Sequence, residues 1–331
     1  MRNGLWGARE RAVAKAIAFP FLLLIVLAGS AGYQAPTARQ DHDPESLRIS
    51  VDVDLVVLHA AVTDGQGGFV SNLGPQDFKV FENRVLQGIR FLRSEDVPVT
   101  VGLVVDHSST MRPKLAEVSA AALSFVRSSN RDDEMFVVNF NERVSLGLRG
   151  AIRFTNSTAE LENAITAAPA GGETALYDAI AKALRELQAG SRDRKVLIVI
   201  SDGGDNASAR NLAQVMKLAE QSSAVIYTVG IFDKEDPDRN PGVLKRLAEA
   251  TGGQAFFPGQ PSEVVAICER IARDIRHQYT IGYVPINLAR DGAYRTIRVT
   301  ARSNGHDTLS VRTRTGYIAR GETRIDKRGA K

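Results

Sequence analysis

Three oxygen-bearing side chains, those of Asp106, Ser108 and Thr110, are spaced two residues apart directly after the apolar segment 101–105. A second apolar segment, 196–200, is followed closely by Asp202. Strands of a parallel sheet with both faces covered are continuous apolar runs, and they end at the edge where open α/β sheets bind ligands. We therefore expect both aspartates at one sheet edge. Carboxylate and hydroxyl oxygens are hard ligands that suit a divalent metal, Mg²⁺ first, with Mn²⁺ and Ca²⁺ as alternatives.

A third segment adds another hydroxyl, because Thr174 follows the pair Gly171-Gly172. Glycines allow a close approach of the backbone. Together the three loops would present two carboxylates and three hydroxyls to one ion. Hydroxyls leave a cation less neutralised than carboxylates would, so the bound ion should attract an external acidic group. The sequence therefore predicts recognition of a carboxylate on a partner protein, whose identity the sequence does not give.

The elements that must position these loops alternate along the chain. From Pro98 onward, apolar strand patterns alternate with amphipathic helix patterns, which is typical of a doubly wound, mostly parallel α/β sheet. We assign this domain to residues 97–276. Short strand patterns, in which apolar and polar residues alternate, occupy residues 48–96 and include 78–82 and 86–92. Similar patterns occupy 277–318. These two segments are predicted to form a small β unit flanking the α/β domain.

The spacing Asp106-x-Ser108-x-Thr110, then Thr174, then Asp202-Gly203, resembles the metal-ion-dependent adhesion site of von Willebrand factor type A domains. The family pattern has Ser where this chain has Thr110, which keeps the hydroxyl. The resemblance implies a Rossmann-like fold and protein binding or adhesion rather than catalysis. It also implies that Ser108, Thr110 and Thr174 are direct ligands, and that Asp106 and Asp202 act directly or through water. Over residues 48–318 the chain is similar to secreted VWFA-related proteins known from Acidobacteria.

Other interpretations of these residues stay open. Asp106 and Ser108 could cap the following helix, which would leave a structural scaffold with a degenerate metal site. A phosphatase-like hydrolase could use Asp106 as a nucleophile, but the haloacid dehalogenase pattern needs a second aspartate where Ser108 stands. No histidine pair has zinc-protease spacing and there is no Gly-x-Ser-x-Gly motif, so we predict a protein that is not an enzyme. His107 is expected to be exposed, Asp205 to be a turn residue and Asp178 to begin a helix.

The termini and the charge indicate export. Residues 1–32 combine basic residues with an apolar run at 16–28 and small residues after it, as in a signal peptide. An uncleaved N-terminal membrane anchor is the alternative. A polar linker at 33–47 follows, and 319–331 form a basic tail. The first 32 residues carry a net charge of +3 of the chain's +4, so the nearly neutral remainder gives no basis for binding nucleic acid. The chain is therefore expected to be periplasmic or secreted, and its one cysteine, Cys268, to lie in the core.

Overall fold

The computed structural model describes residues 55–232, 239–303 and 309–319. The predicted signal peptide 1–32, the linker 33–47 and, apart from its first residue, the basic tail 319–331 lie outside these ranges. So do residues 48–54 of the predicted N-terminal β segment. No helix in the described ranges is long and apolar enough to cross a membrane.

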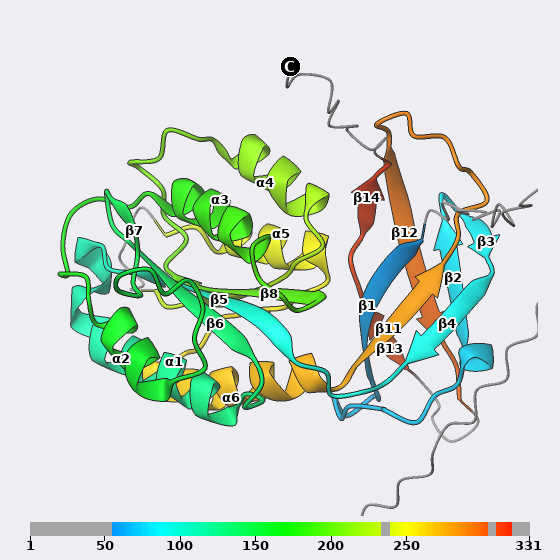
Figure 1. The fold of residues 1–331 in the computed structure, drawn as a ribbon, viewed down its shortest axis with the longest axis horizontal. Helices are drawn as coiled ribbons and strands as arrows, with labels where there is room; N and C mark the ends of the chain where they lie inside the picture. The colour runs from blue at the N-terminus through cyan, green and yellow to red at the C-terminus, as the bar shows by residue number, and fades with distance from the viewer. Residues whose placement is uncertain (1–54, 233–238, 304–308, 320–331) are drawn as a thin grey trace, which may run out of the picture. The chain divides into compact units, whose positions relative to one another are not determined.

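A six-stranded sheet forms the centre of the α/β part of the chain (Figure 1). Its spatial order is β10-β9-β8-β5-β6-β7, and all neighbours are parallel except β7, which runs antiparallel to β6. Every residue of β5 and β8 is buried, as expected for strands covered on both faces. The strands are β5 (Val99–Asp106), β6 (Glu134–Phe140), β7 (Val144–Leu146), β8 (Arg194–Ser201), β9 (Val225–Gly230) and β10 (Ala255–Phe256).

Helices cover both faces of this sheet (Figure 1). One face packs against α1 (Leu115–Ser128), α2 (Thr158–Ile165) and α6 (Val264–Arg276), and Cys268 is fully buried in that core, as predicted. The other face packs against α3 (Leu176–Leu187), α4 (Leu212–Gln221) and α5 (Pro241–Thr251). Short 3-10 helices lie at η1 (Pro75–Asp77), η2 (Ser109–Lys114) and η3 (Pro261–Glu263).

The register of the two central strands positions the candidate site. Val105 of β5 lies opposite Ile200 of β8, so both strands end at the same edge of the sheet. Asp106 is the last residue of β5, and Asp202 directly follows β8. The loops after both strands therefore leave the sheet side by side.

The remaining strands form two four-stranded sheets, ordered β13-β1-β11-β4 and β14-β12-β2-β3. Strands from before and after the α/β part pair directly, β1 with β11 and β2 with β12. Side chains from both sheets share one apolar core. These strands are β1 (Val56–Thr63), β2 (Phe78–Glu82), β3 (Val85–Gln87), β4 (Ile89–Arg93), β11 (Gln278–Tyr283), β12 (Tyr294–Ala301), β13 (Ser310–Arg312) and β14 (Gly316–Ile318).

The predicted fold class, a doubly wound and mostly parallel α/β sheet with a small β unit, is confirmed. The single strand expected at 86–92 is wrong. The chain there forms β3 and β4, separated at Gly88, because β3 pairs with β2 in one sheet and β4 pairs with β11 in the other.

A buried polar cluster lies within the core of the β unit. Glu82 and Arg295 are 3% and 2% exposed, and Arg295 Nη1 lies 3.0 Å from Glu82 Oε1. The hydroxyls of Tyr283 and Tyr317 both donate to Glu82 Oε2, at 2.7 and 2.8 Å. A buried charge is tolerated only when it is paired and hydrogen-bonded, and this carboxylate is both.

Candidate metal centre

The carboxylate of Asp106 is fixed by one bond from its own loop and one from the neighbouring strand β8. Oδ1 accepts the backbone N–H of Ser108 at 2.8 Å, and Oδ2 accepts the hydroxyl of Ser201 at 2.6 Å. The bond to the N–H two residues on is the usual Asx turn, and it turns the chain back over the sheet edge. Asp106 is fully buried.

Three side chains of the predicted site are joined in one hydrogen-bonded chain. Ser108 Oγ lies 3.1 Å from Thr110 Oγ1, which donates to Asp202 Oδ2 at 2.6 Å. Asp202 Oδ1 accepts the N–H of Gly204 at 3.0 Å. Ser108 precedes η2, but its hydroxyl makes no capping bond to that helix. The hydroxyl of Ser108 is therefore bonded to Thr110 and does not cap the helix that follows.

Thr174 lies on a loop that is bonded to both of the other loops. Gly171 N–H donates to the carbonyl of His107, and Ser109 N–H donates to the carbonyl of Gly172, at 2.8 and 3.1 Å. On the other side, Thr174 N–H donates to Asn206 Oδ1 at 2.8 Å, and Asn206 N–H donates to the Thr174 carbonyl at 3.0 Å. Thr174 is 6% exposed, and no hydrogen bond in the described part of the chain joins its hydroxyl to the other four side chains.

Two glycines allow these loops to pack closely. Gly203 has φ +81°, and a Cβ there would lie 2.5 Å from the carbonyl oxygen of Asn240. Gly172 has φ +84°, and a Cβ would overlap the carboxylate of Glu142 at 1.5 Å. Both backbones are in the left-handed region that favours glycine. A side chain at Gly203 would push its loop away from Asn240, whereas one at Gly172 would displace the flexible side chain of Glu142.

The electrostatics of the cluster favour a cation. Burial, together with the nearby charge of Asp202, raises the pKa of Asp106 from 3.8 to about 7, against the hydrogen bonds from Ser201 and Ser108. No ion pair of the described residues involves either aspartate. Two close carboxylates without a basic partner are the arrangement that a divalent ion neutralises. The donor set of carboxylate and hydroxyl oxygens therefore fits Mg²⁺, Mn²⁺ or Ca²⁺.

The same donors do not fit a zinc centre of the usual kind. No three His, Cys, Asp or Glu side chains within the described ranges are grouped so that they could hold a metal. Any ion at this edge of the sheet must therefore depend on hydroxyl oxygens as well as on the two aspartates.

Two supporting residues lie outside the predicted ligand set. Ser201, the last residue of β8, bonds to Asp106, and Asn206 joins the third loop to the second through its side chain and backbone. Their roles depend on which strands are neighbours, which sequence spacing does not reveal. The one signal is the position of Asn206, which lies four residues after Asp202 and close to the glycines of that turn.

The expectation that His107 is exposed is wrong. Its side chain is 2% exposed and Nε2 lies 3.2 Å from Asn139 Oδ1, while Asn139 Nδ2 donates to the carbonyl of Ala164. Burial lowers the pKa of His107. The residue therefore packs beneath the loop, on the opposite side of the chain from its neighbours Asp106 and Ser108, because alternate residues in an extended turn point in opposite directions.

The other acidic residues near the loops have structural partners. Asp205 accepts the N–H of Tyr177 at 3.0 Å and the hydroxyl of Ser208 at 2.6 Å, and so links two loops. Asp178 lies in the first turn of α3, as predicted, and pairs with Arg210 at 2.7 Å. Glu173 is exposed.

A doubly wound α/β domain with an oxygen-rich site at the carboxyl edge of its sheet defines a class of metal-dependent binding domains. The chain belongs to the von Willebrand factor type A domain family, whose description matches residues 100–267. The match spans the central sheet from β5 onward and all three loops of the candidate metal centre. No curated protein matches the sequence.

Several solved structures are similar to the chain. A von Willebrand factor type A protein from Catenulispora acidiphila is 15% identical, with TM-score 0.49, over 82% of this chain and 75% of that one. The vWF domain of the type V pili tip protein Mfa5 from Porphyromonas gingivalis is 17% identical, with TM-score 0.45, over 54% and 95%. Proximal thread matrix protein 1 from the mussel byssus, with a zinc-occupied MIDAS motif, is 18% identical, with TM-score 0.46, over 57% and 48%.

Proposed function

We propose that this chain is an exported protein-binding module that grips an acidic side chain of a partner protein through a divalent ion. The ion is held by Asp106, Ser108, Thr110, Thr174 and Asp202. Membership of the type A family supports a role in protein interaction. The metal, the acidic partner group and the export of the chain are parts of the proposal.

The observation that supports the proposal most strongly is the hydrogen-bonded chain Ser108–Thr110–Asp202. It brings oxygens from two different loops into contact at 3.1 and 2.6 Å, beside the buried carboxylate of Asp106. In the structure these hydroxyls bond to one another and to the carboxylate of Asp202. With an ion, their lone pairs would turn to the metal, and the chain's own bonds would rearrange.

A bound ion would supply a Lewis-acidic position for an incoming carboxylate oxygen. The role of this chain's residues is to fix the ligand oxygens. Ser201 and the N–H of Ser108 orient the carboxylate of Asp106, and Asn206 holds the loop that carries Thr174. Only two of the five proposed ligands are carboxylates, so together they would just balance the two positive charges of the ion. A coordination position of the ion would then be available to an acidic side chain of a partner.

A thermal-unfolding experiment tests the metal site. Mg²⁺ or Mn²⁺ added at about 100 times its Kd should stabilise the folded protein by about 2.7 kcal/mol, which raises the Tm by several degrees. Asp106→Ala and the near-isosteric Asp202→Asn should abolish that rise. Asp132→Ala, which removes an exposed loop carboxylate, is the matched control and should respond to metal as the wild type does.

An unchanged metal response in both site variants would remove the ion from this position. Absence of any response in the wild type at millimolar metal would instead favour the structural scaffold with a degenerate site. Partner binding is tested separately by capture from envelope and culture-medium fractions, with and without chelator. Capture that persists in the chelator and in Asp106→Ala would contradict metal-mediated recognition.

A further inference from the structure

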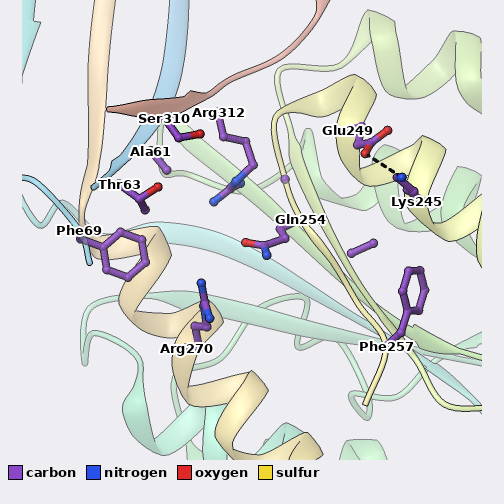
Figure 2. Close-up of a pocket in the computed structure, with 12 residues that line it drawn as sticks. Ala61, Thr63, Phe69, Lys245, Glu249, Gln254, Phe257, Arg270, Ser310 and Arg312 are labelled. Carbon is purple, nitrogen blue, oxygen red and sulfur yellow. Dashed lines mark ion pairs between the residues drawn. The ribbon is translucent and has the colours of Figure 1, made fainter. Parts of the chain in front are cut away.

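A cavity of about 450 Å³ lies away from the candidate metal centre, between the β unit and the α5, β10 and α6 region (Figure 2). Thr63 of β1 and Ser310 of β13 line one side, and they are paired neighbours in the same sheet. Gln254, just before β10, and Arg270 of α6 line the other side. None of the proposed metal ligands belongs to this lining, and the volume is in the range of pockets that hold small molecules.

Four polar side chains of this cavity have no polar partner among the described residues. The guanidinium of Arg270, the amide of Gln254 and the hydroxyls of Thr63 and Ser310 make no side-chain hydrogen bond or ion pair with any described residue. Figure 2 shows Arg270 and Arg312 directed into the same space from opposite sides, with the amide of Gln254 between them. All four uncommitted groups are hydrogen-bond donors.

The charges of the lining leave one cation unbalanced. Arg312 forms an ion pair with the buried carboxylate of Asp274 and donates to the carbonyl of Gly252 at 2.6 Å. Lys245 pairs with Glu249, the acidic residue of the lining, at 3.8 Å along α5. Within the described ranges, the guanidinium of Arg270 interacts only with the face of the Phe256 ring, 6.0 Å from the ring centroid. A cation over a ring remains free to bind an anion through its N–H groups.

The cavity also has an apolar wall. Phe69 lines it, and its ring is stacked on the imidazole of His277 at 5.2 Å between centroids, which holds the ring in place. Ala61 and Ala255 contribute further apolar surface. A convergent set of donors beside a fixed aromatic face is the usual composition of a site for a small organic ligand.

We propose that this cavity binds a small organic anion: an oxyanion head, carboxylate or phosphate, on an aromatic or aliphatic body. Arg270 offers the forked N–H donors that such a head accepts in pairs. Gln254, Thr63 and Ser310 complete the donor set around the head. Phe69 packs against the body of the ligand.

Binding is measured by calorimetry and by saturation-transfer NMR with four probes: benzoate, phenyl phosphate, inorganic phosphate and the uncharged benzamide. Every sample contains EDTA in excess, and the measurements are repeated in Asp106→Ala, because a metal at the other site would also bind a carboxylate. Binding measured under these conditions cannot come from a metal ion at the candidate metal centre, so it tests the cavity separately from the proposed function. Benzoate and phenyl phosphate together show which oxyanion the donors prefer.

We expect at least one of the two aromatic anions to bind at least about tenfold more tightly than benzamide and inorganic phosphate. Arg270→Gln should weaken that binding about tenfold or more, as loss of a charge-assisted bond does. Ser310→Trp, which fills the cavity from an exposed position, should abolish it. Arg273→Gln, an exposed position of the same helix outside the lining, is the matched control and should leave affinity unchanged.

Three outcomes would overturn the proposal. The first is that neither aromatic anion binds at 10 mM (roughly −2.7 kcal/mol or weaker), and the second is that benzamide binds as tightly as the aromatic anions. The third is that both Arg270→Gln and Ser310→Trp bind the anions with wild-type affinity. Benzoate binding that appears only when Mg²⁺ replaces EDTA, and disappears in Asp106→Ala, would assign the anion to the metal centre instead.

Discussion

Thr110 Oγ1 donates a hydrogen bond of 2.6 Å to Asp202 Oδ2, although the two residues are 92 positions apart in the sequence. One follows β5 and the other follows β8, and the parallel pairing of these strands places both at the same sheet edge. The bond ties the two halves of the candidate metal centre together.

A substitution that removes the Thr110 hydroxyl but keeps the side-chain volume should therefore test the role of the hydroxyl alone. In Thr110→Val the side chain keeps its volume but Asp202 Oδ2 loses its donor, and the proposed ion loses a ligand. We expect metal affinity, measured by calorimetry with Mn²⁺, to fall at least about tenfold. Thr110→Ser restores the hydroxyl and should bind metal within a few-fold of the wild type. Equal affinity in the valine variant would exclude this hydroxyl as a ligand.

The close packing of the Asp202 loop predicts a cost for any side chain at Gly203. Gly203→Ala combines a left-handed backbone, φ +81°, with a Cβ only 2.5 Å from the Asn240 carbonyl oxygen. We expect a loss of about 2–3 kcal/mol in the free energy of unfolding, measured in urea, from strain and clash together. Gly292 has a similar φ of +74° but open space around it. Gly292→Ala should cost only about 1 kcal/mol, and equal losses in the two variants would show that packing adds nothing.

The buried Glu82–Arg295 pair should matter far more to stability than an exposed pair. Glu82→Ala leaves Arg295, 2% exposed, without its carboxylate, and leaves two tyrosine hydroxyls without an acceptor. We expect a loss of about 3–5 kcal/mol in urea unfolding. The control is Glu249→Ala, which breaks a pair whose side chains are 62% and 61% exposed and should cost about 1 kcal/mol or less. A loss below about 1 kcal/mol for Glu82→Ala would contradict the view that this buried pair is important for stability.

His59 predicts a specific dependence of stability on pH. Burial, together with the positive charges of Arg194 and Arg314, lowers its pKa from 6.5 to about 3. Below pH 6.5 the unfolded chain takes up a proton that the folded protein does not, so stability falls as the pH falls from 6.5 toward 3. This residue contributes a slope of at most about 1.4 kcal/mol per pH unit.

His59→Gln keeps a polar side chain beside Thr280, whose hydroxyl lies 3.4 Å from His59 Nδ1, but it cannot titrate. Urea unfolding at pH 7, 6, 5 and 4 should show a shallower decline for His59→Gln than for the wild type. Parallel curves for the two proteins would mean that the imidazole is protonated as readily in the folded protein as in the unfolded chain.

The strand segments of the α/β part could be predicted closely because burial on both faces leaves a plain apolar pattern. The apolar segments 101–105 and 196–200 lie within β5 and β8. The segment 86–92 could not be divided correctly, since its apolar residues serve two different sheets and only strand pairing separates them. His107 was misjudged for a related reason: its polarity suggested exposure, but Asn139 on β6 provides a buried partner.

The sequence by itself determined the fold class and the candidate ligands Asp106, Ser108, Thr110, Thr174 and Asp202, because apolar runs fix strands and strand ends fix where polar loops emerge. Only the tertiary structure decided what holds those ligands. The bonds from Ser201 to Asp106 and from Thr174 to Asn206, and the cavity beside Arg270, join residues that no local pattern connects. Contacts between distant segments depend on which surfaces pack together, and a one-dimensional pattern of residue types does not contain that information.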